Sequence, residues 1–270
     1  MISPSNSIPF VKATACGNDF LLIHLQEIER EIPPASMAEF TRKICDRHNG
    51  VGADGVEWIS PHPTADVEIR LINADGSDAE ISGNGTRCVA ASICESQHKD
   101  RISIMTGAGL KTCVLVGRNE FEYEFEAEMG DAVVEAEISI ASTDGEVYGV
   151  PVSMGNPHFV VFMPRFTGDW RTRASAIQRS AVFTHGVNVE MVVCDGLHDI
   201  QVKFFERGVG ETLSSGTGSC AAAVAAVSSG RTQFPVRVHA DGGIQTVTRD
   251  GTIFLRGPAR LLCHGNFFLG

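Results

Sequence analysis

Two copies of a Ser-Gly-x-Gly sequence are the residues of this chain best suited to chemistry. Ser82 begins the first copy and Ser215 the second, and each copy runs into small residues that predict a helix. The backbone N–H groups at a helix start have no acceptor inside the helix, and with the helix dipole they favour an anion. Glycine lets a ligand approach the backbone closely. One Ser-Gly alone would indicate a helix cap; two copies indicate a site with two matching walls, which suits chemistry at both faces of one atom.

The repeat extends beyond the two serines. Gly17-Asn18-Asp19-Phe20 is echoed by Gly155-Asn156-Pro157-His158-Phe159, 138 positions later, and the serine motif recurs after 133 positions. Both offsets are close to half of the 270 residues. We therefore expect an internal duplication with two similar mixed α/β domains, residues 1–130 and 131–261, and a tail, 262–270, that returns to the first. Coincidence among glycine-rich turns is the alternative.

Most of the chain predicts short strands separated by turns, with few helices. The segment 120–128 alternates strictly between apolar and charged residues, so one of its faces should be buried. The other expected strands are 67–73, 159–163, 189–194, 200–205, 236–239 and 253–256. The expected helices are 36–47, with Ser36 as its cap, and the small-residue segments 84–95 and 218–228, which should be buried.

Composition argues against several classes of function. The net charge of −11, without a Lys/Arg cluster, argues against nucleic-acid binding. The first six residues lack the features of a signal peptide, and the longest small apolar run, 220–227, is too short to span a bilayer. The eight cysteines have no C-x-x-C or metal-ligand spacing. We expect a cytoplasmic protein without membrane or metal, with mostly free, buried thiols.

Other motifs carry less weight. Residues 50–55 match G-x-G-x-x-G, but they follow a helix end and not a strand, which argues against a dinucleotide site. No G-x-S-x-G surrounds either serine, and there is no P-loop or H-E-x-x-H. Asp54 and Asp75 lie in glycine-containing turns and are expected to be structural.

The chain resembles the diaminopimelate epimerase family, whose members are cofactor-independent amino-acid epimerases that share a fold with proline racemase and the phenazine-biosynthesis isomerase. The matching stretches are Gly17-Asn18-Asp19-Phe20, residues 47–54, Asn73 to Cys88, Gly155-Asn156-Pro157-His158, Gly186-Val187-Asn188 and Glu206 to Cys220. The resemblance implies an α+β fold of two pseudo-symmetric domains, each a mostly antiparallel sheet around a central helix. It places the active site in the cleft between them and implies a homodimer without a cofactor.

The family mechanism uses two cysteines that remove and return the α-proton on opposite faces, and so interconverts LL- and meso-2,6-diaminopimelate in lysine and cell-wall precursor biosynthesis. This chain has Ser82 and Ser215 at those two positions, where they are the expected catalytic residues. Cys88 and Cys220 lie further along the helices and do not replace the missing thiols. Serine is a much weaker acid and needs an adjacent base, and no base is adjacent in sequence, although His48 or His158 could approach in space.

Three interpretations stay open. The chain could be an epimerase in which both cysteines are exchanged for serine, and whose activity is therefore impaired. It could be a natural homologue with other chemistry, such as an isomerase or racemase of another small amino acid. It could also be a binding protein for an amino acid that has lost catalysis. The paired motifs favour the epimerase.

The resemblance also assigns the substrate-binding residues. Asn18, Asn73, Asn156, Asn188, Glu206 and Arg207 are expected at the distal end of the substrate, and Gly83, Asn84, Gly216 and Thr217 at the α-carboxylate. His158 is a possible accessory residue. The simpler interpretations are turn chemistry for the asparagines, a surface ion pair for Glu206 and Arg207, and a hydrogen-bonded core side chain for His158. Some family members carry glutamine where this chain has Gly55.

Overall fold

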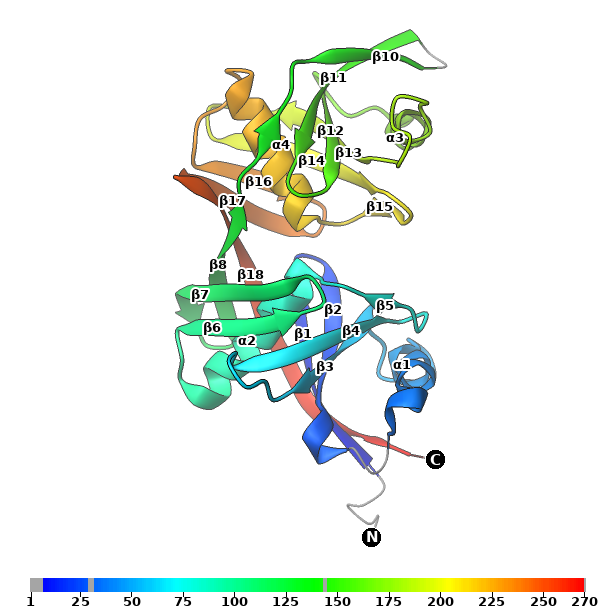
Figure 1. Cartoon of the computed structure of the whole chain (residues 1–270), viewed down its shortest axis with the longest axis vertical. Coiled ribbons are helices and arrows are strands. Elements are labelled where there is room, and N and C mark those ends of the chain that lie inside the picture. Colours follow the sequence, from blue (N-terminus) through cyan, green and yellow to red (C-terminus); the bar gives the residue numbers. More distant parts are fainter. Residues whose placement is uncertain (1–6, 29–31, 143–144, 270) are drawn as a thin grey trace. The chain divides into compact units, whose positions relative to one another are not determined.

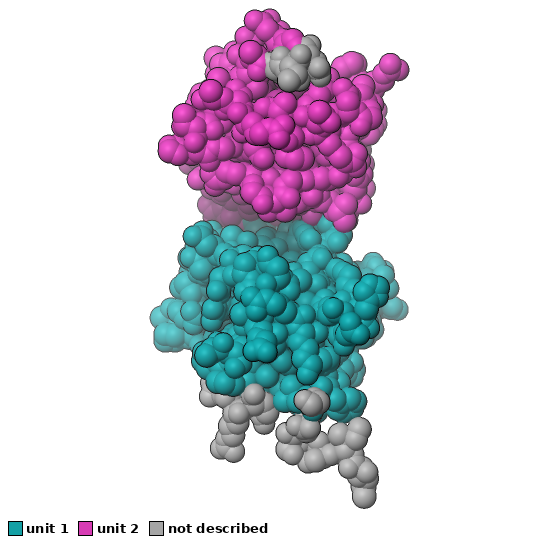
Figure 2. All heavy atoms as spheres, turned by 90° about the vertical axis from the view of Figure 1, so that its right-hand side faces the viewer, with its two compact units in different colours: residues 1–127, 258–270 teal, residues 128–257 magenta. Residues whose placement is uncertain are grey.

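A computed structural model describes residues 7–28, 32–142 and 145–269 of the chain (Figure 1). The chain forms two compact units, Met1–Ala127 with Pro258–Gly270 and Glu128–Gly257, which Figure 2 colours separately. Within the described ranges, no helix is both long enough and apolar enough to cross a membrane. The expected absence of a signal peptide concerns residues 1–6, which lie outside the described residues.

The first unit contains two α-helices and most of the early strands. Its elements are β1 (Ser7–Ala15), β2 (Asn18–His24), the 3-10 helices η2 (Leu25–Glu27) and η3 (Pro34–Ser36), α1 (Met37–Cys45), β3 (Gly55–Ser60), β4 (Val67–Asn73), β5 (Asp78–Ala79), α2 (Gly83–Gln97), β6 (Arg101–Thr106) and β7 (Gly109–Asn119). Strand β8 (Glu122–Gly130) leads from this unit into the second one.

The second unit has a corresponding set of elements. They are β9 (Val133–Val134), β10 (Ile138–Ser142), β11 (Gly145–Ser153), β12 (Pro157–Phe162), α3 (Trp170–Gln178), β13 (Asn188–Cys194), β14 (Asp199–Glu206), β15 (Gly210–Thr212), α4 (Gly216–Ser228), β16 (Val236–Ala240) and β17 (Gly243–Asp250). Strand β18 (Thr252–Phe268) leads back into the first unit.

Both units connect their strands in the same way. In the first unit, β1–β2, β3–β4, β6–β7 and β7–β8 are antiparallel pairs, whereas β2–β3 and β4–β6 are parallel. In the second unit, β11–β12, β13–β14, β16–β17 and β17–β18 are antiparallel, whereas β12–β13 and β14–β16 are parallel. The helix of small residues, α2 or α4, precedes the second parallel partner in each case. The mixed α/β arrangement of the first unit is therefore repeated in the second.

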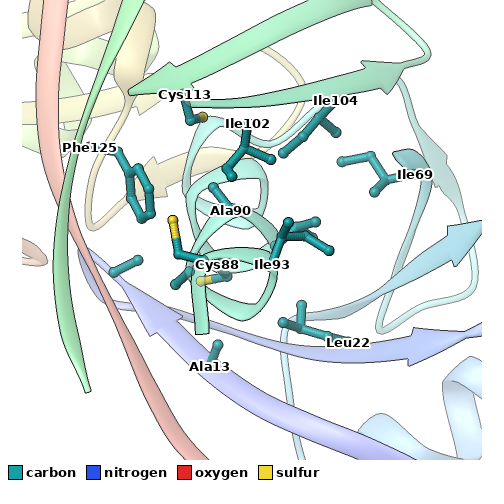
Figure 3. Close-up of a cluster of buried hydrophobic side chains, with 14 of the residues drawn as sticks. Ala13, Leu22, Ile69, Cys88, Ala90, Ile93, Ile102, Ile104, Cys113 and Phe125 are labelled. Atoms are coloured by element: carbon teal, nitrogen blue, oxygen red, sulfur yellow. The ribbon is translucent and has the colours of Figure 1, made fainter. Parts of the chain in front are cut away.

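The small-residue helices form the centre of each unit, as their composition predicted. In α2, Cys88, Ala90 and Ile93 pack against apolar side chains of the surrounding strands, among them Ile102 and Phe125 (Figure 3). In α4, every residue from Cys220 to Ala226 is buried. Small side chains let the helix lie close to the strands around it. The first turn of each helix is thereby packed against the sheet.

A second core lies under the other helix of each unit. Phe40 and Ile44 of α1 pack with Trp58 of β3. Trp170 and Ile177 of α3 belong to the corresponding cluster of the second unit. Both clusters bury bulky side chains, so each unit has an apolar core on either side of its sheet.

The strand predictions were correct in position and differ mainly at the ends. The strand expected at 120–128 is β8, in which Tyr123 and Phe125 are buried and the alternate glutamates Glu122 and Glu124 are exposed. The last predicted strand is only the beginning of the much longer β18. Helix α3 was not expected, because it has no side-chain cap at its start and only three buried residues.

The cysteines are free thiols, as expected. Six are buried, whereas Cys194 is half-buried and Cys263 is exposed.

Candidate active site

Ser82 and Ser215 occupy the same local conformation in the two units. Each has extended backbone geometry and is the N-cap of its helix, α2 or α4. The Ser82 Oγ atom accepts a hydrogen bond from the Gly85 backbone N–H at 3.1 Å, and the Ser215 Oγ atom accepts one from Gly218 at 3.3 Å. The helices begin directly after the serines, so their first N–H groups, which lack intrahelical acceptors, lie beside the hydroxyl groups. Each serine motif is thus a half-site suited to a carboxylate.

In each unit an asparagine is tied to the second residue of the helix. Asn18 is the first residue of β2, and Asn156 directly precedes β12. In the first unit, Asn84 Nδ2 donates to Asn18 Oδ1 at 2.7 Å. In the second unit, Asn156 Nδ2 donates to Thr217 Oγ1 at 3.3 Å. Asn18 also donates to Asp54 Oδ2 at 3.0 Å, which fixes its amide group. The structure therefore brings these four predicted substrate-binding residues to the helix starts, two in each unit.

Asn18 is hydrogen-bonded to a network of ion pairs through Asp54. Arg47 Nη2 lies 2.7 Å from both Asp19 Oδ1 and Asp54 Oδ1, and Lys12 Nζ lies 3.0 Å from Asp19 Oδ2. Burial by itself would raise the pKa of Asp19, but hydrogen bonds from Arg47 and Lys12 outweigh it and hold that pKa below the ordinary value. Asp54 accepts from both Asn18 and the Asp19 backbone N–H. Asp54 is therefore structural, as the turn sequence predicted.

His158 is part of a buried polar chain in the second unit. Its Nδ1 atom lies 2.7 Å from Glu190 Oε1, and its Nε2 atom lies 3.0 Å from Asn156 Oδ1. The chain Glu190–His158–Asn156–Thr217 leads to the first turn of α4. Burial raises the pKa of Glu190, and the adjacent His158 opposes this shift. Both ring nitrogens of His158 are thus satisfied inside the protein, and the imidazole orients Asn156.

The first unit contains a buried carboxyl group without a partner. Glu57, on β3, is 0 % exposed, and neither of its carboxyl oxygens has a hydrogen-bond partner among the described residues. Its Oε1 atom lies so close to Gly85 that a β-carbon added there would be 1.9 Å away. Burial raises the pKa of Glu57 to about 8. The same glycine whose N–H binds Ser82 Oγ therefore lies against the Glu57 carboxyl group.

Glu57 and Glu190 hold equivalent positions. Each is the third residue of its strand, β3 or β13, and each lies 25 residues before its serine. In the parallel register with the preceding strand, Phe20 of the first unit stands where His158 stands in the second. An apolar ring therefore replaces the imidazole, which explains why Glu190 has a hydrogen-bond partner and Glu57 has none within the described ranges.

Neither glutamate was recognised from the sequence. The signal that could have identified them is a charged residue inside an otherwise apolar strand. An unpaired carboxylate is costly to bury, so its presence there indicates a function. The two glutamates are also 133 positions apart, the same offset that separates Ser82 and Ser215.

Asn188 acts as a brace between two backbone segments. Its Nδ2 atom donates to the Pro157 carbonyl at 3.1 Å, and its Oδ1 atom accepts from the Arg207 backbone N–H at 2.9 Å. The Arg207 guanidinium donates to the His185 carbonyl at 2.9 Å. No ion pair joins it to Glu206 in the part of the chain that the structure describes, so the surface ion-pair interpretation is not supported.

Three further residues belong to turn regions: Asn73 ends β4, and Asp75 and His48 lie in the turns that follow β4 and α1. Asn73 Nδ2 donates to Ser77 Oγ at 3.0 Å, and Asp75 Oδ1 accepts from both the backbone N–H and the hydroxyl group of Ser77. This is turn chemistry, as expected for Asp75 and as the simpler interpretation held for Asn73. His48 donates its backbone N–H to Asp46 Oδ1 at 2.8 Å. No described contact joins its ring to Ser82.

Sequence comparisons place these features in context. The family model described as "Diaminopimelate epimerase" matches residues 10–135 and 150–262. The diaminopimelate epimerase of Desulfitobacterium hafniense is 34% identical over 274 residues and that of Methanothrix thermoacetophila is 38% identical over 271 residues. These alignments cover 94% and 96% of this chain, respectively, and 96% of each relative.

Solved structures with the same fold are more distant in sequence. A phenazine biosynthesis protein of the PhzF family from Bacillus anthracis has a TM-score of 0.71 at 16% identity, covering 96% of this chain and 98% of its own. A probable proline racemase from Agrobacterium radiobacter, solved with bound carbonate, has a TM-score of 0.69 at 15% identity, covering 96% of this chain and 92% of its own. At these identities the likeness shows the fold alone.

Proposed function

Because this chain belongs to the diaminopimelate epimerase family, we propose that it interconverts LL- and meso-2,6-diaminopimelate by moving a proton at the α-carbon. The observation that carries the proposal is the pair of equivalent half-sites. In each, a serine caps a buried helix, and an asparagine at the start of β2 or directly before β12 is tied to the second residue of that helix. Two equivalent half-sites suit a reaction that removes a proton from one face of an atom and adds one to the other.

In this proposal the α-carboxylate is held by the starts of the two helices, and negative charge that develops on it is stabilised there. The residues concerned are Gly83, Asn84, Gly216 and Thr217. Asn18, Asn73, Asn156, Asn188, Glu206 and Arg207 are proposed to contact the distal amino and carboxylate groups. One substrate must then be held by both half-sites, in a cleft between two pseudo-symmetric domains at 1–130 and 131–261.

Ser82 and Ser215 are proposed to stand where the family has its two proton-transferring thiols. The buried thiols near them do not supply the missing acidity. Burial raises the pKa of Cys88 far above its ordinary value and that of Cys220 to about 12. Since serine is the weaker acid, we expect slower turnover than a cysteine-containing chain would show.

The proposal includes the setting of the reaction. We propose a cytoplasmic, cofactor-independent homodimer that acts in lysine and cell-wall precursor biosynthesis.

The test is α-proton exchange into deuterated water with diaminopimelate as substrate. The unaltered chain, Ser82→Cys, Ser215→Cys and the double variant are compared by NMR, and the LL and meso forms are separated chromatographically. We expect the double variant to exchange about 10²-fold faster than the unaltered chain. The exposed thiol variant Cys263→Ser is the control and should not change the rate. If no cysteine-containing form exchanges or epimerises the substrate, the proposal is wrong.

The absence of both thiols favours two alternatives, an isomerase or racemase of another small amino acid and a non-catalytic amino-acid binder. Calorimetry against a panel of amino and imino acids distinguishes both alternatives from the epimerase. Tight binding of an acid other than diaminopimelate, without exchange of diaminopimelate by the double cysteine variant, would favour the alternatives.

A further inference from the structure

The half-site of the first unit contains a carboxyl group for which the described residues offer no hydrogen-bond partner. Glu57 is fully buried, and both its oxygens lack hydrogen-bond partners in the described part of the chain. Leaving a buried polar group unpaired is unfavourable, and the cost is larger when the group is charged. An apolar residue would be more stable here, since Glu57 faces Leu22 on one neighbouring strand and Leu71 on the other. The position of the carboxyl group therefore points to a use beyond packing.

The carboxyl group lies beside the capping serine. A β-carbon built on Gly85 would be 1.9 Å from Glu57 Oε1 and 3.3 Å from Ser82 Cβ. The carboxyl oxygen and the serine side chain therefore adjoin the same point of the first helical turn, and only glycine fits there. Ser82 Oγ already accepts from the Gly85 N–H at 3.1 Å. Its hydroxyl proton has no acceptor among the described residues, so it is available as a donor.

The second unit has a related arrangement, but there the carboxyl group of the glutamate has a hydrogen-bond partner. Glu190 Oε1 would be 2.8 Å from a β-carbon on Gly218, the glycine that donates to Ser215 Oγ. That oxygen is also bound by His158, so the glutamate is partly satisfied. Only the Glu190 Oε2 atom lacks a partner among the described residues. The first unit, with Phe20 at the position of the histidine, leaves its carboxyl group free to exchange a proton.

We propose that Glu57 accepts and returns the proton that Ser82 exchanges with the substrate, and so supplies the base that a serine requires at this position. The inference rests on the proposed epimerisation. Glu57 acts through Ser82, so it is a positioning and proton-relay residue and does not itself touch the substrate.

The proton step balances as follows. The α C–H bond of the substrate breaks and its electron pair stays on the α-carbon and its carboxylate. Ser82 Oγ takes this proton while the original hydroxyl proton passes to an oxygen of the Glu57 carboxylate, directly or through one water molecule. The reverse transfer, from a protonated Glu57 through Ser82, protonates the α-carbon on the same face. Proton transfer through one water is within the usual reach of a general base.

The surroundings of Glu57 suit this role. Burial alone raises its pKa to about 8, and no charged side chain among the described residues contributes to the shift. Burial raises the pKa of the Cys88 thiol on α2, the negative charge of Glu57 adds to this shift, and the thiol therefore stays neutral. A carboxyl group with a pKa near working pH can both accept and donate a proton, which an ordinary glutamate does poorly.

The experiment combines two substitutions in the full chain and measures α-proton exchange of diaminopimelate across pH. In the unaltered chain, Glu57→Gln should lower the exchange rate at least about 10²-fold. The rate of the unaltered chain should rise as pH approaches about 8, and Glu57→Gln should abolish this rise. In a Ser82→Cys background the same substitution should change the rate less than about tenfold, because a thiol ionises without help. Glu57→Asp should recover part of the lost activity.

Controls separate a relay from a structural role. Glu68→Gln, on the adjacent strand β4 and exposed, removes a carboxyl group of the same unit and should leave every rate unchanged. An equal loss of exchange in the unaltered chain and in the Ser82→Cys background, or an unchanged pH profile in Glu57→Gln, would overturn the inference. Exchange by Ser82→Cys but none by the unaltered chain would overturn it too, while leaving the proposed function intact. Silence of every form, including the double cysteine variant, would instead refute the proposed function.

Discussion

At the scale of single residues, burial determines the chemistry of the ionisable groups around the two serines. Asp19 keeps a low pKa because Arg47 and Lys12 bind it, so it stays charged. Glu190 is hydrogen-bonded to His158. Among the described residues, no cation or hydrogen-bond donor contacts Glu57, so burial alone makes its charged form costly. These three carboxyl groups thus differ according to which side chain stands opposite them.

The raised pKa of Glu57 has a consequence for stability. Its pKa is about 8 in the folded chain against an ordinary value of 4.5. Between these values the folded chain holds a proton that the unfolded chain has released, so the free energy of unfolding must fall as pH rises. We expect Glu57→Gln to remove about 1.4 kcal/mol per pH unit of this dependence. Urea unfolding at several pH values in this range measures it. Parallel pH curves for the two chains would contradict the expected protonation of Glu57.

At the scale of elements, the two serines have a structural duty besides any catalytic one. Each caps a helix that lies in the centre of its unit, and each accepts, through Oγ, a hydrogen bond from the backbone N–H of the glycine three residues on. Helices α2 and α4 begin at the residue after the cap, whereas the sequence expectation placed their starts one or two residues later. Capping and catalysis therefore make different demands on the same hydroxyl group, and the two can be measured separately.

The capping contribution should appear in stability. Ser82→Ala and Ser215→Ala should each lower the free energy of unfolding by about 1 kcal/mol. Ser36→Ala is the matched control, since Ser36 is the N-cap of α1 but its side chain makes no cap hydrogen bond. In chemical denaturation, Ser36→Ala should lower the free energy of unfolding by less than Ser82→Ala or Ser215→Ala does. A loss at Ser36 equal to that at Ser82 would show that the hydrogen bond to Gly85 contributes little.

At the scale of the whole molecule, the duplication is visible in the order of elements and in the strand pairings of the two units. Each unit buries its own cores, and the eight thiols lie mostly inside them. Burial raises the pKa of Cys45 and Cys113 to about 12, so these groups are neutral and unreactive in the folded chain.

Thiol labelling should follow this burial. In the native chain we expect rapid reaction of Cys263, which is exposed, and slower reaction of the half-buried Cys194. The six buried thiols should react only on unfolding. Ellman's reagent measured with and without denaturant gives both counts, and Cys263→Ser should abolish the fast phase. Rapid native labelling of several thiols would contradict the described cores.

Local patterns made much of the fold predictable. The alternation around Tyr123 and Phe125 marks one buried strand face, and the small residues after Ser215 mark a buried helix, because period and side-chain size depend on neighbouring residues only. Helix α3 was missed because its stability comes from tertiary packing of Trp170 and Ile177 and not from a cap.

The sequence by itself determined the repeated serine motif, the strands and helices that carry it, and membership of the family. Each of these depends on short runs of consecutive residues, which can be recognised without knowing the tertiary contacts. Only the tertiary structure decided which side chains surround the buried carboxyl group of each half-site, and therefore its pKa. Glu57 meets Gly85 across 28 positions of the chain, and the parallel strand register gives Phe20 the place in the first unit that His158 has in the second. Contacts between distant segments depend on how strands align, and the cost of burying an unpaired charge depends on those contacts.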